Sequence, residues 1–211
     1  MPLDHARATT DGQTSASGYL VVLSAPSGGG KTTILQRLLQ TNSPDFCYSI
    51  SATTRKPRGS EQHGREYFFL SAEEFQQGIE RGRFLEYALV HGNLYGTPRE
   101  NVEKWLALGK FVLMDIDVQG GIHVKRQLGP RAILIFIQPP SFELLRERLH
   151  GRNTDSPEEI AARLQAAHDE MEAAEQYDYV VVNHDLEETV RRVVEIIASY
   201  RKANAVAAAN V

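Results

Sequence analysis

Apolar residues gather in short unbroken runs along this chain, and longer segments with helical spacing separate the runs. Four runs fit buried strands: residues 19–24, 111–114, 132–137 and 179–182. A helix that begins at Lys31 follows the first run, and its apolar positions fall on one side: Ile34, Leu35, Leu38 and Leu39. Runs without polar alternation are typical of strands covered on both faces. The alternation of strands and helices therefore predicts an α/β fold with a parallel-sheet core.

Polar residues that can accept backbone hydrogen bonds mark the predicted helix starts. Ser141 is placed to cap a helix that runs to Leu149. Asp185 and Glu188 form a capping-box pattern, and the helix after them has these apolar positions: Val190, Val193, Val194 and Ile197. These caps agree with the helices that the apolar spacing predicts.

Two segments interrupt the α/β rhythm. Residues 47–97 contain short strand signals at 48–50, 66–69 and 84–87, and Ser71 with Glu74 predicts a capped helix between the last two. This segment is interpreted as a small α+β insertion. Residues 148–176 carry basic side chains on helices that flank a polar turn. In a protein that transfers phosphate, such insertions are natural places for an acceptor site and a closing lid.

Composition narrows the range of functions. The chain has 211 residues, a formal net charge of −4 and one cysteine, Cys47, so an intrachain disulfide is excluded and no nucleic-acid partner is indicated. The run at 132–137 is too short to span a membrane. Residues 1–17 lack the apolar core of a secretory signal and are expected to be disordered, and a frayed tail is expected over 203–211. We expect a cytoplasmic protein without a membrane partner; the oligomeric state, monomer or homo-oligomer, is left open.

A glycine-rich loop lies between the first strand and the first helix. The residues expected to bind ATP there are Ala25, Pro26, Ser27, Gly28, Gly29, Gly30, Lys31, Thr32 and Thr33. Small residues let backbone N–H groups wrap around phosphate oxygens, Lys31 can reach the β- and γ-phosphates, and Thr32 can offer its hydroxyl to Mg²⁺. Ala25 stands where this motif usually has its first glycine. A plain glycine-rich turn is the alternative, which the strand–turn–helix context disfavours.

A second phosphate site is predicted in residues 51–58. Arg55 and Arg58 follow a predicted strand, and arginine binds phosphate through paired hydrogen bonds. Tyr67 and Tyr95 can add hydroxyl donors. A solvated basic loop with two core tyrosines is the alternative. Beside a phosphate-binding loop, the arginines are better explained by a phosphorylated acceptor.

Several motifs occur in a fixed order after this loop: 51–58 (SATTRKPR), 64–69 (GREYFF), 84–87 (FLEY), 92–97 (GNLYGT) and 115–120 (DIDVQG). Together with the loop they resemble guanylate kinase, and the likeness covers residues 18–200. The family phosphorylates GMP with ATP and Mg²⁺, giving GDP and ADP. The resemblance implies a P-loop nucleoside monophosphate kinase fold over 18–205. Its expected parts are a core (18–46, 98–147 and 177–202), a GMP-binding insertion (47–97) and a helical lid (148–176).

The resemblance also assigns the acceptor site. The residues implied to hold the GMP phosphate are Arg55, Arg58, Tyr67 and Tyr95. Those implied to read guanine are Ser51, Glu86, Thr97 and Asp117. A carboxylate suits guanine because N1–H and N2–H₂ present adjacent donors, which adenine lacks. Bland alternatives are a solvent-facing Glu86, a capping box that begins at Thr97, and Asp117 as the cap of the helix from Val118.

On the donor side, the resemblance implies that Arg148, Arg152 and Arg163 clamp the ATP phosphates, and a solvated helix face is the alternative. Asn183 is implied to lie near the adenine, although asparagine after a strand is also ordinary turn chemistry. Asp115 ends a strand and is placed to help hold Mg²⁺ through water, together with Thr32.

The implied mechanism needs no general base, because the acceptor phosphate is already ionised at neutral pH. We therefore expect no catalytic His or Cys, and the charges that assist transfer come from Lys31, Arg55, Arg148, Arg152 and Arg163. Two other functions fit part of the pattern: a catalytically inactive guanylate-kinase-like binding module, and a P-loop kinase for another nucleoside monophosphate. The complete Gly30-Lys31-Thr32 sequence favours an enzyme, and the guanine-reading set favours GMP.

Overall fold

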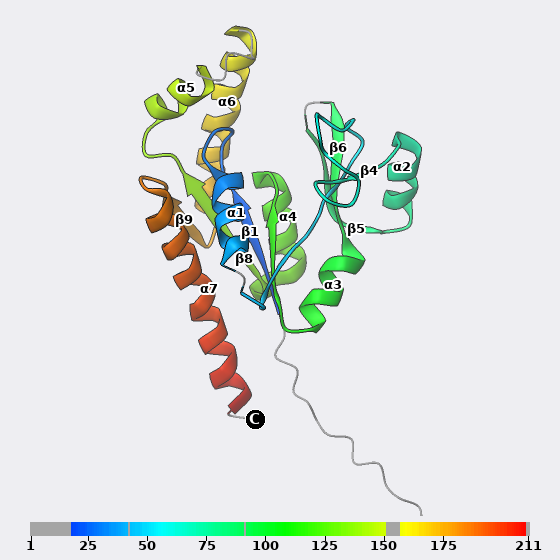
Figure 1. The fold of residues 1–211 in the computed structure, drawn as a ribbon, viewed down its shortest axis with the longest axis vertical. Helices are drawn as coiled ribbons and strands as arrows, with labels where there is room; N and C mark the ends of the chain where they lie inside the picture. Colours follow the sequence, from blue (N-terminus) through cyan, green and yellow to red (C-terminus); the bar gives the residue numbers. More distant parts are fainter. Residues whose placement is uncertain (1–17, 42, 91, 151–156, 210–211) are drawn as a thin grey trace, which may run out of the picture.

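A computed structural model describes the backbone of residues 18–41, 43–90, 92–150 and 157–209, and the side chains of the same residues except 157–159 and 203–209. Its centre is a five-stranded parallel sheet in the order β2-β7-β1-β8-β9 (Figure 1). The strands are β1 (Tyr19–Ser24), β2 (Phe46–Tyr48), β7 (Phe111–Asp115), β8 (Ala132–Gln138) and β9 (Tyr179–Val182). The four apolar runs thus form the strands predicted, and the parallel α/β core is confirmed.

Successive strand residues point to opposite faces of this sheet, and helices cover both faces. Val21 and Leu23 pack in one cluster with α1 (Lys31–Gln40) and α7 (Leu186–Ala209). Leu20 and Val22 pack on the other face with α3 (Arg99–Ala107) and α4 (Val118–Leu128). Short 3₁₀ turns lie at Gly129–Arg131 (η1) and Ala174–Gln176 (η2). All four of these strand residues are fully buried, which explains the unbroken apolar runs.

The insertion forms a second sheet beside the core, in the order β4-β3-β6-β5. Its strands are β3 (Ala52–Thr53), β4 (Phe68–Phe69), β5 (Phe84–Val90) and β6 (Asn93–Pro98), with α2 (Ala72–Glu80) packed against them. The rings of Phe75 and Phe84 stack at 4.3 Å inside this lobe. The strand predicted at 48–50 differs: β2 pairs with β7 and belongs to the core sheet rather than to the insertion.

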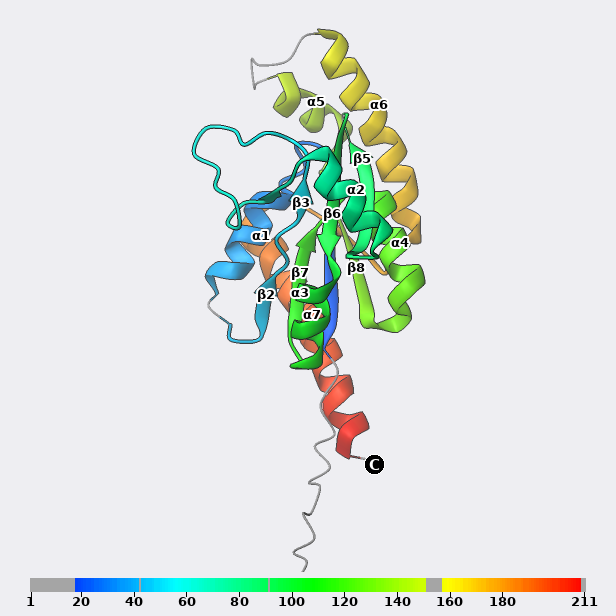
Figure 2. The ribbon, with the colours of Figure 1, turned by 90° about the vertical axis from the view of Figure 1, so that its right-hand side faces the viewer.

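Helices α5 (Phe142–His150) and α6 (Pro157–Ala173) stand over one end of the sheet (Figures 1 and 2), and the lid expected over 148–176 contains the end of α5 and all of α6. Leu145 and Leu149 of α5 pack against Ile160 and Ala167 of α6. Arg152, expected in the lid, lies outside the described residues, as does the extension expected over 1–17. No helix in the described part of the chain is long and apolar enough to cross a membrane.

The predicted helix caps can be compared with the hydrogen bonds formed. Ser71 and Glu74 form a complete capping box on α2. Ser141 accepts from the Leu144 N–H at 3.1 Å, and Asp185 accepts from the Glu188 N–H at 2.9 Å. Where a frayed tail was expected from residue 203, the backbone of α7 is helical as far as Ala209.

Candidate functional site

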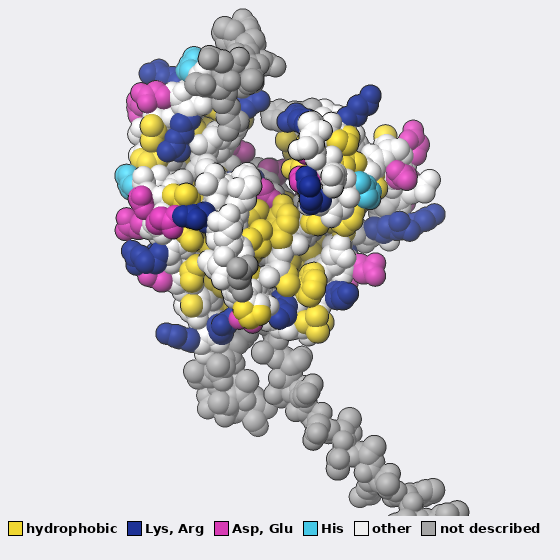
Figure 3. Space-filling model, viewed as in Figure 1, with side chains coloured by type: hydrophobic (Ala, Val, Ile, Leu, Met, Phe, Trp, Pro, Cys, Tyr) yellow, Lys and Arg dark blue, Asp and Glu magenta, His cyan; other side chains and the backbone are white. Residues whose placement is uncertain are grey.

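A large cavity of about 840 Å³ opens at the ends of β1 and β7, between the lid and the insertion. Figure 3 shows the molecule hollowed between these two lobes. The lining comes from the loop before α1, the turn between β7 and α4, strands β5 and β6, and helix α6. Ligands bind at this end of a parallel sheet because loops and helix N-termini converge there.

The glycine-rich loop adopts a conformation that depends on two of its glycines. Gly28 and Gly30 have φ angles of 88° and 94°, a region that side chains rarely enter. A Cβ at Gly30 would also lie 2.6 Å from the side-chain nitrogen of Asn183. Gly30 immediately precedes α1, so backbone N–H groups of the first helical turn face the cavity end of the loop. Ala25 is accommodated because the left-handed positions fall elsewhere in the loop.

Asn183 holds this loop from behind. Its side-chain amide donates to the Gly29 carbonyl at 3.1 Å, and its carbonyl accepts from the Thr189 hydroxyl at 3.1 Å. Asn183 is only 8% exposed although it borders the cavity. Both ends of the amide are therefore used within the protein, and its structural role is to position the loop.

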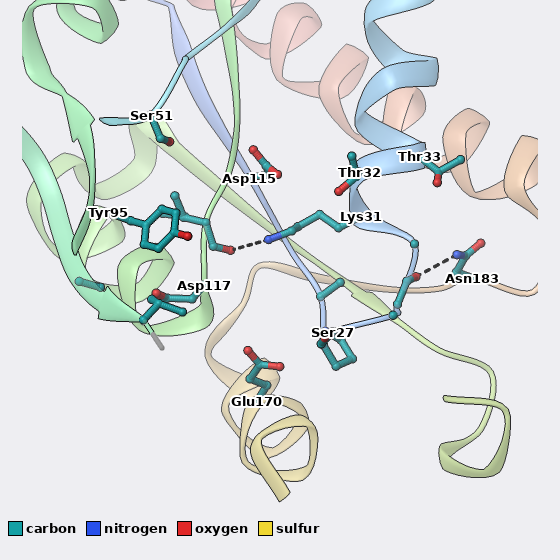
Figure 4. A pocket seen from close by; sticks show the side chains of 18 of the residues that line it. Ser27, Lys31, Thr32, Thr33, Ser51, Tyr95, Asp115, Asp117, Glu170 and Asn183 are labelled. Carbon is teal, nitrogen blue, oxygen red and sulfur yellow. Dashed lines mark hydrogen bonds between the residues drawn. The ribbon is translucent and has the colours of Figure 1, made fainter. Parts of the chain in front are cut away.

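Lys31, Thr32 and Thr33 begin α1 and border the same cavity. Figure 4 shows Lys31 extending across the pocket, where its ammonium group donates to the Ile116 carbonyl at 3.4 Å. This bond is long for a charged donor. Lys31 is thus directed into the cavity and held only weakly.

The turn between β7 and α4 brings two aspartates to the cavity. Asp115 accepts a hydrogen bond of 2.8 Å from the Tyr48 hydroxyl. Asp117 caps α4 by accepting from the Gly120 N–H at 2.7 Å, which confirms the capping interpretation of this residue. Both border the cavity, so the cap does not remove Asp117 from the site.

Glu86 is the most deeply buried carboxylate of the cavity wall, with 5% of the residue exposed. The alternative of a solvent-facing glutamate is therefore wrong. Burial raises the pKa of Glu86 to about 7, against the lowering effect of a 2.5 Å hydrogen bond from the Thr97 hydroxyl. Ser51, also buried, borders the same cavity. Glu86 thus offers an acceptor whose charge changes near neutral pH.

Thr97 stands behind Glu86 and does not cap a helix. Pro98 occupies the N-cap position of α3, which begins at Arg99, so the capping-box interpretation is wrong. Thr97 is completely buried, and its single hydroxyl proton is used by Glu86. Its position is that of a residue that orients a carboxylate.

Arg55 lies behind the two tyrosines that border the cavity. Its guanidinium contacts the face of Tyr67 at 5.3 Å, and its Nε–H donates to the Tyr95 hydroxyl at 3.2 Å. Two further bonds, of 2.9 and 3.0 Å, bind it to the carboxylate of Glu61. These bonds raise the pKa of Arg55 and, with the backbone N–H of Arg58, hold the pKa of Glu61 below its usual range.

Arg58 takes part in this cluster through its backbone, which donates to Glu61 at 2.7 Å, while the residue itself is exposed. Sequence reasoning missed Glu61. The only available signal was an acidic residue six positions after Arg55 in a loop rich in basic residues.

Two of the predicted lid arginines reach the glycine-rich loop. Arg148 donates to the Gly28 carbonyl at 3.4 Å, and Arg163 to the Ser27 hydroxyl at 3.5 Å. Of the predicted site residues that the structure describes, four do not line the cavity: Arg55, Arg58, Thr97 and Arg163.

Glu170 of α6 was not predicted, yet it borders the cavity and points into it (Figure 4). Burial raises the pKa of Glu170 to about 7, against the opposing effect of nearby Lys31. No cluster of three or more His, Cys, Asp or Glu side chains suited to a metal ion occurs in the described part of the chain.

A family model described as guanylate kinase matches residues 17–200. The chain belongs to the guanylate kinase family. It is 50% identical over 185 residues to a guanylate kinase of Bacteroides thetaiotaomicron, which covers 87% of this chain and 90% of that protein. It is also 50% identical over 185 residues to a guanylate kinase of Synechocystis, covering 88% of this chain and 96% of that one. The predicted family is thus confirmed.

A crystal structure of guanylate kinase from Anaplasma phagocytophilum superposes with a TM-score of 0.74 and 36% sequence identity, covering 88% of this chain and 87% of the other. The match confirms the P-loop nucleoside monophosphate kinase fold.

Proposed function

We propose that this protein transfers the γ-phosphoryl group of ATP to GMP, giving ADP and GDP. One observation carries the choice of acceptor: the buried carboxylate of Glu86 lies in the same cavity as the glycine-rich loop and Lys31. Guanine presents the N1–H and N2–H₂ donors side by side, and an ionised carboxylate accepts from both. Adenine and the pyrimidines lack this pair, so their binding would leave the buried charge without the second set of donors that guanine supplies beside the Thr97 hydroxyl.

On the donor side, the ATP triphosphate would lie in the loop of residues 25–30. The N-terminus of α1 favours an anion there, and Lys31 can exchange its weak bond to Ile116 for a phosphate oxygen. Thr32 supplies a hydroxyl and Asp115 a carboxylate. Oxygen donors of this kind, few in number and completed by water and phosphate, fit Mg²⁺. When bound, that ion neutralises charge on the phosphates.

On the acceptor side, Tyr67 and Tyr95 border the cavity and Arg55 lies directly behind them. The Tyr95 oxygen already accepts from Arg55, so its own proton is free to be donated to the GMP phosphate. Arg58 is exposed, and its backbone N–H donates to Glu61, the same carboxylate that Arg55 binds. We infer that these four residues hold the acceptor phosphate, and that Ser51, Glu86 and Asp117 face the base, with Thr97 orienting Glu86.

Catalysis in this arrangement comes from alignment and charge. The acceptor phosphate is itself the nucleophile, so no residue has to remove a proton. Lys31 and the arginines reduce the repulsion between two anions. Arg148 and Arg163 already contact the loop, and Arg152 is proposed with them from the sequence. Closure of the lid and the insertion over the substrates would exclude water and suppress hydrolysis of ATP.

ADP release with ATP and Mg²⁺, compared across GMP, AMP, dTMP, CMP and no acceptor, tests this proposal. We expect ADP only with GMP, and none with GMP for Lys31→Ala, which should still bind GMP. Lys104→Ala, which removes an exposed lysine of α3, is the matched control and should be active. Turnover with another monophosphate would overturn the role of Glu86. Folded protein without turnover would indicate a binding module.

A further inference from the structure

Two buried hydroxyl groups lie directly behind the cavity, and nothing in the proposed reaction uses them. Ser24 ends β1, immediately before the glycine-rich loop, and is completely buried. Tyr177 follows η2, where the chain returns from the lid to the core, and is 8% exposed. The Tyr177 hydroxyl donates to the Ser24 hydroxyl at 2.7 Å, although the two residues are 153 positions apart.

The Ser24 hydroxyl in turn donates a hydrogen bond to the turn between β7 and α4. It donates to the Ile116 carbonyl at 2.8 Å. The same carbonyl accepts the long bond from Lys31. Ile116 lies between Asp115 and Asp117. Its carbonyl is therefore bonded directly to Ser24 and Lys31, and through Ser24 it is connected to Tyr177.

The Tyr177 hydroxyl is closely packed against the first turn of α4. A Cβ at Gly121 would lie 2.3 Å from the Tyr177 oxygen, and a Cβ at Gly120 would lie 3.0 Å from the Glu86 carboxylate. The first turn of α4 is therefore confined between Tyr177 on one side and Glu86 on the other. A shift of the tyrosine hydroxyl would move the helix whose N-cap is Asp117.

The hydroxyl itself calls for an explanation. Tyr177 packs in the apolar cluster behind the sheet, with its ring edge-on to Phe136 at 5.7 Å. A phenylalanine would fill the same space without placing a polar group in an apolar environment. Burial raises the pKa of Tyr177, so the group remains a neutral hydrogen-bond donor. The hydrogen bond to Ser24, rather than ring packing, is the feature specific to tyrosine here.

We propose that Tyr177 and Ser24 are positioning residues for GMP: they fix the turn of residues 115–117 and the first turn of α4, and so set Asp117 against Glu86. Tyr177 is the first core residue after the predicted lid, so the hydrogen-bonded pair also connects the end of the lid to the base site. The inference rests on the proposed GMP kinase function, because it concerns how the base-binding residues of that reaction are held.

Tyr177→Phe removes the hydroxyl and keeps the ring. We expect the KM for GMP to rise about three- to tenfold, the range for one neutral hydrogen bond, and the KM for ATP to rise less, because Lys31 shares only a long bond with the Ile116 carbonyl. Tyr179→Phe is the matched control: it removes a hydroxyl on the opposite face of the sheet, in the cluster with α7, and should leave both KM values unchanged. Equal increases in both KM values for Tyr177→Phe, or none, would overturn the inference.

A double-mutant cycle gives a second readout that a purely structural role would not produce. Ser24→Ala removes both bonds of the pair, so adding Tyr177→Phe should raise the KM for GMP no further. Additive effects would show that the two hydroxyls act separately and would contradict the inference. Wild-type protein is assayed in parallel. If it shows no GMP-dependent turnover, the proposed function fails; if it is active and Tyr177→Phe matches it, only the positioning role fails.

Discussion

Arg55 holds the carboxylate of Glu61 through two hydrogen bonds, of 2.9 and 3.0 Å, at the edge of the cavity. Its other contacts are the Lys56 carbonyl at 2.7 Å and the Tyr95 hydroxyl at 3.2 Å. A guanidinium has five N–H groups, and these contacts use four of them. One N–H is left for an acceptor phosphate. Paired bonds from Arg55 to a phosphate cannot form while these four contacts are kept, which supports the proposal that Tyr95 and Arg58 share the phosphate with Arg55.

We predict that Glu61 acts on the acceptor through Arg55 rather than through Arg58, whose backbone N–H it also accepts. Arg55→Lys loses the planar geometry that serves Glu61 and Tyr95 together, and should raise the KM for GMP roughly tenfold or more with the KM for ATP little changed. Glu61→Gln should give a smaller rise, about two- to fivefold, because one side-chain oxygen still accepts. Steady-state kinetics of the double variant checks the logic. A double variant clearly worse than Arg55→Lys would mean that Glu61 has a separate role.

Thr97 is expected to control the charge of Glu86. Thr97→Val keeps the shape of the buried side chain and removes the hydroxyl that stabilises the ionised carboxylate. The pKa of Glu86 should then rise, and GMP affinity at pH 7 should fall about three- to tenfold. Titration calorimetry with GMP measures this. Thr97→Ser, which keeps the hydroxyl and loses a methyl group, is the control and should bind GMP nearly as the wild type does. Equal losses in both variants would indicate a packing role.

Guanine recognition should depend on pH through Glu86. Its pKa is raised to about 7, and only the ionised form accepts from both guanine donors. Affinity should therefore weaken as pH falls through 7, approaching tenfold per pH unit below it. Guanosine is the ligand to use, because it has no phosphate that titrates in this range.

Glu170 also has a raised pKa near 7, so a control is needed. Glu86→Gln retains Glu170 and should bind guanosine weakly, with no dependence on pH between 6 and 8. In Thr97→Val the midpoint should move to higher pH. A wild-type affinity that stays constant from pH 6 to 8 would rule out Glu86 as the group that reads guanine.

Local sequence patterns predicted the parts of the fold that depend on local physics. The four buried strands were predicted because both of their faces are covered, and the cap of α2 because Ser71 and Glu74 lie three residues apart. The placement of β2 could not be predicted in the same way. Its three residues have no periodicity, and its partner strand β7 lies more than 60 positions further along the chain.

The site followed the same rule. The glycine-rich loop and Glu86 lie in recognisable motifs, whereas Glu61 is one charge in a polar loop. Thr97 shows how a local pattern can mislead, because Thr97-Pro98-Arg99-Glu100 has the sequence of a capping box. The buried carboxylate of Glu86, brought there by β5, takes its hydroxyl instead. Glu61 was missed although its partners Arg55 and Arg58 are close in sequence, because its loop has no periodic pattern, whereas Thr97 was misjudged because its partner lies on another strand.

The loop conformation gives the last prediction. Gly30→Ala would place a Cβ 2.6 Å from the side-chain nitrogen of Asn183, at a φ of 94°. The left-handed region alone costs about 1–2 kcal/mol for an alanine, and the clash would displace either the loop or the Asn183 amide that holds it. ATP binding should therefore be lost while GMP binding, proposed to use the other lobe, is kept. Binding of each nucleotide alone, measured by calorimetry, tests this expectation.

Gly82→Ala separates backbone strain from the clash. Gly82 has a φ of 63°, and an added Cβ there would meet no atom within 4 Å. This variant should lose a similar amount of stability, about 1–2 kcal/mol, from backbone strain alone, and should bind ATP normally. Asn183→Ala combined with Gly30→Ala removes the clash. The strained φ remains and the hydrogen bond to the Gly29 carbonyl is lost, so the double variant should restore ATP binding only in part. Normal ATP binding by Gly30→Ala would contradict the dependence of the phosphate site on this loop conformation.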